Sequence, residues 1–109
     1  MPELPEVETI KNTLKYLVQK KTIVDVQIYW PKIIKYPDDI ERFKLLLHGQ
    51  TIHDISRRGK FLQFELDDYV LVSHLRMEGK YSVEDQHTDV TKHTHVIFTF
   101  KDGDQLRYN

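Results

Sequence analysis

The sequence predicts an α+β fold that is mostly β: an antiparallel β-sandwich or flattened barrel of about six to eight strands flanked by two helices. Two segments have helical periodicity, and most of the rest alternates with a period of two between turn residues. Such closely connected strands must run mostly antiparallel. With 109 residues, 39% of them hydrophobic, the chain suits one domain with one core.

The first helix is expected at residues 5–19. Its apolar residues recur at spacings of three and four and so share one face: Leu4, Val7, Ile10, Leu14 and Leu17. Pro5 suits a first helical turn, and acidic residues near the start with lysines near the end complement the helix dipole.

A second, shorter helix should follow Pro37, with Asp38 or Asp39 as its cap. Gly49 is suited to end this helix in a left-handed conformation. Its inward-facing residues should be Ile40, Phe43, Leu46 and Leu47.

Five segments are expected to be strands, because they are rich in β-branched or alternating apolar residues and are bounded by turn residues. They are residues 22–29, 51–58, 60–66, 69–76 and 95–100. Residues 83–92 are polar and are expected to form a mobile loop.

Composition excludes several classes of protein. Without cysteine there are no disulfides or thiolate metal sites, and no apolar run has membrane-spanning length. We therefore expect a soluble, cytoplasmic protein. A formal net charge of -1 counts against a complete DNA-binding protein, although a local basic patch or a missing basic part remains compatible with it.

The N-terminus carries the most informative chemistry. Removal of Met1 would leave Pro2 with a secondary amine, whose reference pKa of about 8 leaves a neutral, nucleophilic fraction near pH 7. Attack of this amine on a sugar carbon would give an iminium ion, an electron sink that favours elimination of the neighbouring phosphate. Glu3 is placed to transfer protons. If Met1 is retained, the Pro2 nitrogen is a tertiary amide and cannot attack.

The opening MPELPEVET resembles the formamidopyrimidine-DNA glycosylase family, bacterial base-excision repair enzymes that remove oxidised purines. Four further segments resemble the family in its own order: RRGKFL at 57–62, HLRMEG at 74–79, KHTHV at 92–96 and LRY at 106–108. The resemblance therefore covers the whole chain.

The resemblance also implies roles for individual residues. Pro2 would be the Schiff-base nucleophile, Glu3 the general acid, and Lys60 a catalytic residue that assists elimination and binds phosphate. DNA would be bound by His74 and His93 on its backbone and by Met77, which would fill the space left by the flipped nucleotide. Glu6 would support the site, and further phosphate contacts would come from Arg57, Arg58, Arg76 and Lys80.

At the level of domains, the resemblance implies that residues 1–109 are an N-terminal catalytic domain. The family continues into a helix-two-turn-helix and zinc-finger domain that is absent here, so no cofactor is expected in this fragment. The expected partners are damaged double-stranded DNA and the missing C-terminal domain, with no membrane, in the bacterial cytoplasm and on the nucleoid when bound to DNA. The fragment alone should have little or no activity.

Simpler interpretations stay open. The domain could be a non-catalytic structural or weakly DNA-binding module, with Lys60 merely solvated, Met77 filling core space and Glu6 serving the helix dipole. His93 and His95 could suggest a metal, but a third ligand is missing. A relative that prefers oxidised pyrimidines is disfavoured, because those enzymes usually have glycine where this chain has Leu4.

Overall fold

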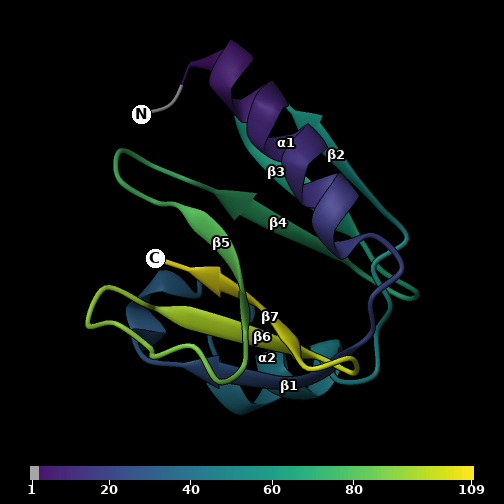
Figure 1. Cartoon of the computed structure of the whole chain (residues 1–109), viewed down its shortest axis with the longest axis vertical. Helices are drawn as coiled ribbons and strands as arrows, with labels where there is room; N and C mark the ends of the chain where they lie inside the picture. Colours follow the sequence, from purple (N-terminus) through teal and green to yellow (C-terminus); the bar gives the residue numbers. More distant parts are fainter. Residues whose placement is uncertain (1–2) are drawn as a thin grey trace. The chain divides into compact units, whose positions relative to one another are not determined.

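The computed structural model describes residues 3–109 and divides them into two compact units. The first unit comprises residues 3–21 and 51–80, and the second comprises residues 22–50 and 81–109. Each unit has one antiparallel sheet and one α-helix (Figure 1). The expected mostly β fold with two helices is confirmed, with seven strands in the described part of the chain.

In the first unit, helix α1 (Leu4–Val18) packs against a three-stranded sheet. The strands are β2 (Asp54–Arg58), β3 (Phe61–Glu65) and β4 (Val70–His74), in the order β2-β3-β4. Of the predicted apolar face, the helix buries Val7 and Leu14, whereas Leu4 and Leu17 are exposed. Val18, which the prediction did not include, is buried as well.

The second unit is built on a four-stranded sheet in the order β1-β6-β7-β5. Its strands are β1 (Ile23–Ile28), β5 (Tyr81–Asp85), β6 (Val96–Phe100) and β7 (Asp104–Tyr108). A 3-10 turn, η1 (Pro31–Ile33), and helix α2 (Ile40–Leu47) lie between β1 and the first unit's β2 along the chain.

Helix α2 begins and ends as the sequence predicts. The Asp39 carboxylate caps it by accepting hydrogen bonds from the backbone N–H groups of Glu41 and Arg42, at 3.0 and 3.2 Å. Gly49 follows the helix with φ +81°, a conformation that costs glycine little. Of the expected inward-facing residues, Phe43 and Leu47 are buried.

The predicted loop at residues 83–92 is wrong at its beginning, because residues 83–85 belong to strand β5. This strand pairs with β7 from Tyr81↔Tyr108 to Asp85↔Asp104. It lies at the edge of the sheet and its residues are at most partly buried, so its sequence lacks the apolar alternation of a half-buried strand. Long-range pairing with β7 specifies it instead.

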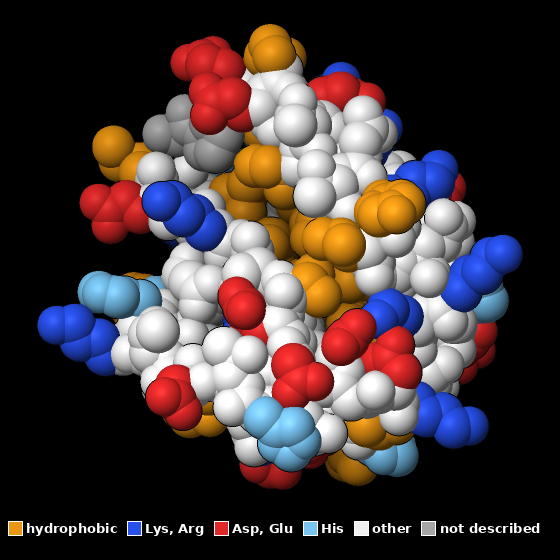
Figure 2. Space-filling model, in the orientation of Figure 1, with side chains coloured by type: hydrophobic (Ala, Val, Ile, Leu, Met, Phe, Trp, Pro, Cys, Tyr) orange, Lys and Arg blue, Asp and Glu red, His pale blue; other side chains and the backbone are white. Residues whose placement is uncertain are grey.

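The surface mixes charges of both signs. On the face drawn in Figure 2, acidic and basic side chains are interspersed over most of the surface. This distribution agrees with the net charge of -1. Neither helix among residues 3–109 has the length and hydrophobicity needed to span a bilayer.

Candidate active site in the first unit

The first unit holds the further phosphate-contact candidates Arg57, Arg58 and Lys80 and six other predicted site residues: Glu3, Glu6, Lys60, His74, Arg76 and Met77. His93 belongs to the second unit and is described separately. Pro2, the expected nucleophile, lies outside the described residues. The described part of the candidate site is therefore centred on Lys60.

Strand pairing brings Lys60 and His74 to one end of the three-stranded sheet. Phe61, the residue after Lys60, pairs with His74 across the β3–β4 ladder. Their rings lie 4.8 Å apart between centroids, at an interplanar angle of 43°. Because Lys60 immediately precedes Phe61, the strand pairing places Lys60 and His74, which are distant in sequence, at the same end of the sheet.

The turn between β2 and β3 presents Lys60. Gly59 has φ +59°, the left-handed region that a side chain disfavours, so glycine suits this position. The Arg57 guanidinium donates through Nη1 to the Gly59 carbonyl oxygen at 3.1 Å. The turn is thus tied to the strand that precedes it.

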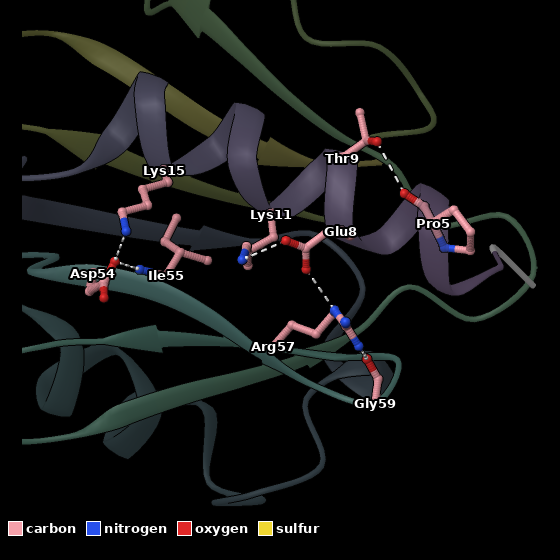
Figure 3. Close-up of polar contacts among 9 residues, drawn as sticks. All are labelled: Pro5, Glu8, Thr9, Lys11, Lys15, Asp54, Ile55, Arg57 and Gly59. Atoms are coloured by element: carbon pink, nitrogen blue, oxygen red, sulfur yellow. Dashed lines mark hydrogen bonds and ion pairs between the residues drawn. The ribbon is translucent and has the colours of Figure 1, made fainter.

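Two ion pairs join α1 to β2 and show that they run in opposite directions (Figure 3). Arg57 Nε lies 2.8 Å from Glu8 Oε1, and Lys15 Nζ lies 3.0 Å from Asp54 Oδ1. The step from Glu8 to Lys15 spans roughly 10 Å along a helix. The step from Asp54 to Arg57 spans roughly the same length of strand. The two pairs are therefore in register, and the Lys60 turn lies towards the N-terminal end of α1.

This end of α1 carries Glu3 and Glu6. The Glu6 carboxylate accepts a hydrogen bond from the Glu3 backbone N–H at 3.4 Å, which is half of a capping box. Both side chains are exposed. Glu6 thus has a structural role at the helix start, as the simpler interpretation expects.

The segment after β4 exposes Met77. Leu75 is buried, and the Gly79 N–H donates to the Leu75 carbonyl at 2.8 Å, which closes a turn around residues 76–78. Arg76 has φ +60° in this turn. Met77 is 80% exposed, so the interpretation of Met77 as core filler is wrong.

Electrostatics in the first unit centre on Glu8. Hydrogen bonds from Arg57 and Lys11 lower the pKa of the Glu8 carboxyl from 4.5 to about 2. The Lys15 ammonium and the Ile55 N–H similarly lower the pKa of Asp54. Arg57, expected among the phosphate contacts, is therefore engaged with Glu8 and Gly59 in this structure.

In the second unit, His93 is exposed on a short turn with its own supports. Its backbone N–H donates to the Thr91 hydroxyl at 3.2 Å. The Thr94 hydroxyl donates to Asn109 Oδ1 at 2.8 Å, and Asn109 Nδ2 donates to Ser82 Oγ at 3.2 Å. Side chains from two strand ends thus hold the turn that carries His93.

Arg107 is a buried cation that sequence reasoning treated only as part of a motif. It is 3% exposed and donates to the Gln105 side chain and to the backbone carbonyls of Thr88 and Asp89, at distances from 2.7 to 3.2 Å. A further contact reaches the Asp85 carbonyl at 3.4 Å. The local sequence contains no signal for this role, because strand β7 (DQLRY) is largely polar.

Metal chemistry finds no support in the residues described. Within residues 3–109, no three His, Asp or Glu side chains are grouped as metal ligands. His95 contacts the rings of Trp30 and Tyr108, with centroids 4.9 and 6.3 Å away. These aromatic contacts give His95 a packing role.

Comparison with known proteins identifies the class to which this architecture belongs. The family model of the formamidopyrimidine-DNA glycosylase N-terminal domain matches residues 1–109. Formamidopyrimidine-DNA glycosylase of Shouchella clausii is 66% identical over 108 residues, which are 99% of this chain and 39% of that protein. The Bacillus subtilis protein of the same name is 60% identical over the same shares.

Solved structures of proteins from the same family have the same fold as this chain. The crystal structure of a complex between the Lactococcus lactis Fpg and an abasic site containing DNA matches 98% of this chain with a TM-score of 0.92 and 40% identity. A complex between the LlFpg protein, a THF-DNA and an inhibitor matches the same share, also with a TM-score of 0.92. In both, the match covers 39% of the other chain.

The architecture and these matches define the class of this chain as a domain of the DNA glycosylases. The chain belongs to the formamidopyrimidine-DNA glycosylase family, in which it matches the N-terminal domain. It spans about two fifths of the length of the curated relatives that it matches, 39% for both the Shouchella clausii and the Bacillus subtilis proteins.

Proposed function

We propose that this chain is the catalytic domain of a bifunctional DNA glycosylase and abasic-site lyase that repairs oxidised purines. The supporting observation is an identity of 66% to a named glycosylase over 99% of the chain, with every proposed catalytic residue inside the match. The proposed partner is damaged double-stranded DNA in the bacterial cytoplasm. A C-terminal domain of the same enzyme, beyond these 109 residues, would complete the DNA-binding groove and carry the family's zinc.

The proposed reaction begins at the Pro2 secondary amine. Its nitrogen attacks C1′ of the damaged nucleotide and the bond from C1′ to the base breaks, with a proton delivered to the departing base. Opening of the sugar ring, with Glu3 protonating the ring oxygen, leaves an iminium ion between Pro2 and C1′. Loss of a C2′ proton then expels the phosphate from C3′. Lys60 assists this elimination.

The surroundings of Lys60 support these roles. Lys60 and His74 lie at one end of the sheet, where a cation and an imidazole can bind adjacent phosphates of one strand. Met77 offers an exposed, unbranched thioether for the space left by a flipped nucleotide.

The proposal is tested on a duplex oligonucleotide with one abasic site, incubated with the chain and sodium borohydride. At an abasic site the amine and the aldehyde form the iminium with loss of water, and borohydride reduces it to a stable amine. We expect a covalent adduct by mass spectrometry, weak and slow compared with that of a full-length relative. Peptide mapping should place the adduct on Pro2.

Two variants separate catalysis from mere binding. Acetylation of the N-terminus would turn the Pro2 nitrogen into an amide without supplying a new amine and should abolish the adduct, whereas Lys60→Ala should slow strand cleavage and leave the adduct. An unmodified chain with a confirmed free Pro2 that forms no adduct, yet binds abasic duplex in a salt-dependent manner, would instead establish the non-catalytic interpretation. Intact mass must first show that Met1 has been removed.

A further inference from the structure

The Glu8–Arg57 pair differs from the other pair between α1 and β2, because its arginine also holds a turn. We propose that Glu8 and Arg57 are positioning residues, which together brace the Gly59–Lys60 turn beside the first turns of α1. This inference rests on the proposed function, since it gives Lys60 a fixed place next to the helix that follows Pro2. These two side chains are called the brace.

The hydrogen bonds of the brace fix the orientation of the Arg57 guanidinium and of the Glu8 carboxylate. Arg57 uses Nε for Glu8 at 2.8 Å and Nη1 for the Gly59 carbonyl at 3.1 Å, so two directions in the guanidinium plane are fixed (Figure 3). Lys11 Nζ holds the second oxygen of Glu8 at 2.9 Å. The carboxylate is therefore oriented from its own helix before it meets Arg57.

Stability alone gives a weak reason for such an arrangement. The Glu8 and Arg57 side chains are 41% and 30% exposed, and partly exposed ion pairs contribute little to the free energy of unfolding. Orientation is a stronger reason, because a misplacement of about 1 Å can slow a catalysed reaction about 100-fold. The residue after the braced carbonyl is Lys60 itself.

The chain supplies a matched control. Lys15 and Asp54 join the same helix to the same strand at 3.0 Å, with side chains 44% and 42% exposed. The Asp54 carboxylate also accepts from the Ile55 N–H at 2.8 Å, a contact within β2 and away from the turn. Asp54→Asn therefore removes an equivalent ion pair without touching Lys60.

The first measurement is backbone amide hydrogen exchange at residues 58–61, read by NMR in the 109-residue chain. We expect Arg57→Met and Glu8→Gln to speed exchange at the turn about tenfold, and Asp54→Asn to change it less than about twofold. Arg57→Lys should behave like Arg57→Met, because an ammonium can keep the charge but not both contacts. Thermal unfolding confirms that each variant is folded.

The second measurement is the rate of phosphate elimination on the abasic duplex under single-turnover conditions. Arg57→Met should slow elimination about tenfold relative to formation of the borohydride-trapped adduct, with both rates measured at saturating protein so that any loss of phosphate binding by Arg57 does not enter. In a Lys60→Ala background the same change should have less than about a twofold effect, because a positioning residue acts through Lys60. If Arg57 had only a structural role, Arg57→Met would slow elimination by the same factor with and without Lys60.

The outcomes separate this inference from the proposed function. A chain without any adduct refutes the proposed function, and the exchange measurement still decides on the brace. Unchanged exchange in Arg57→Met overturns the brace whatever the chemistry shows, with Glu8→Gln as the deciding variant if Arg57→Met unfolds. A loosened turn with an unchanged elimination rate in an active chain overturns the positioning role.

Discussion

Glu8 is a surface carboxylate whose ionisation the folded state strongly favours. Two cations donate to its two oxygens, Arg57 at 2.8 Å and Lys11 at 2.9 Å, and the pKa falls to about 2. The unfolded chain loses these partners, so its carboxyl takes up a proton at a higher pH than the native one does.

This difference predicts a contribution of Glu8 to acid sensitivity. The stabilisation is fully present above pH 4.5 and is lost as the pH falls towards 2, because unfolding then takes up a proton. Urea unfolding of the unmodified chain should therefore show a larger loss of stability between pH 5 and pH 2.5 than Glu8→Gln shows. Arg57→Met should flatten the profile in the same direction, and identical profiles for all three chains would contradict the assignment.

At the scale of elements, Arg107 fixes the connection between β5 and β6. Strand β7 carries this residue, and its guanidinium reaches carbonyls at Thr88 and Asp89 in that connection. The expectation of a mobile loop at residues 83–92 thus overlooked a buried anchor in a strand far along the chain. These hydrogen bonds tie two carbonyls of the connection to strand β7.

We predict that Arg107→Met lowers the free energy of unfolding by about 2 to 4 kcal/mol, because the buried Gln105 side chain and the part-buried carbonyl contacts of Thr88 and Asp89 lose a charged donor. Arg107→Lys should recover less than half of this loss, since an ammonium cannot reach all of them. Chemical unfolding measures the loss, and hydrogen exchange at residues 86–95 should rise in both variants. The control Arg42→Met, on an exposed site of α2, should stay within about 0.5 kcal/mol.

The sequence predicted correctly those elements that are specified by residues close together in the chain. The spacing of apolar residues specified α1, and Asp39 and Gly49 bounded α2, because capping and left-handed backbone depend on the residue itself. Strand β5 was missed since its pairing with β7 depends on residues more than twenty positions away along most of the strand.

For the candidate site, too, the sequence indicated residues that lie in short motifs but not contacts between distant residues. The motif resemblance named Lys60, His74 and Met77, and the pairing of Phe61 with His74 places Lys60 and His74 at the same end of the sheet. Glu8 and Arg57 were noticed only as a dipole residue and a phosphate contact, because their pairing spans 49 positions in the sequence. Periodicity cannot reveal a contact of that range.

For the whole molecule, a net charge of -1 sets how strongly the chain can bind a polyanion. If Lys60 and Arg76 are the cations that contact phosphates, the slope of log affinity against log salt is about -1.8. Affinity for abasic duplex should then fall about tenfold between 50 and 200 mM salt. Arg76→Gln should reduce the slope by about 0.9, and fluorescence anisotropy measures both values.

Lys101→Gln is the control for this measurement, because Lys101 is an exposed cation of the second unit outside the predicted site. It should leave the slope unchanged. A slope close to zero in the unmodified chain would mean that no phosphate is neutralised.

The two units are interleaved along the chain, since residues 22–50 of the second separate the two parts of the first. A ribosome that has released fifty residues has therefore completed neither sheet. The sheet of the first unit is complete only once β4 has emerged, and the second unit lacks β5, β6 and β7, three of its four strands, until still later. During translation this domain can therefore complete its fold only after most of its residues have emerged from the ribosome. Until β2, β3 and β4 have emerged, the apolar face of helix α1 has no sheet against which to pack.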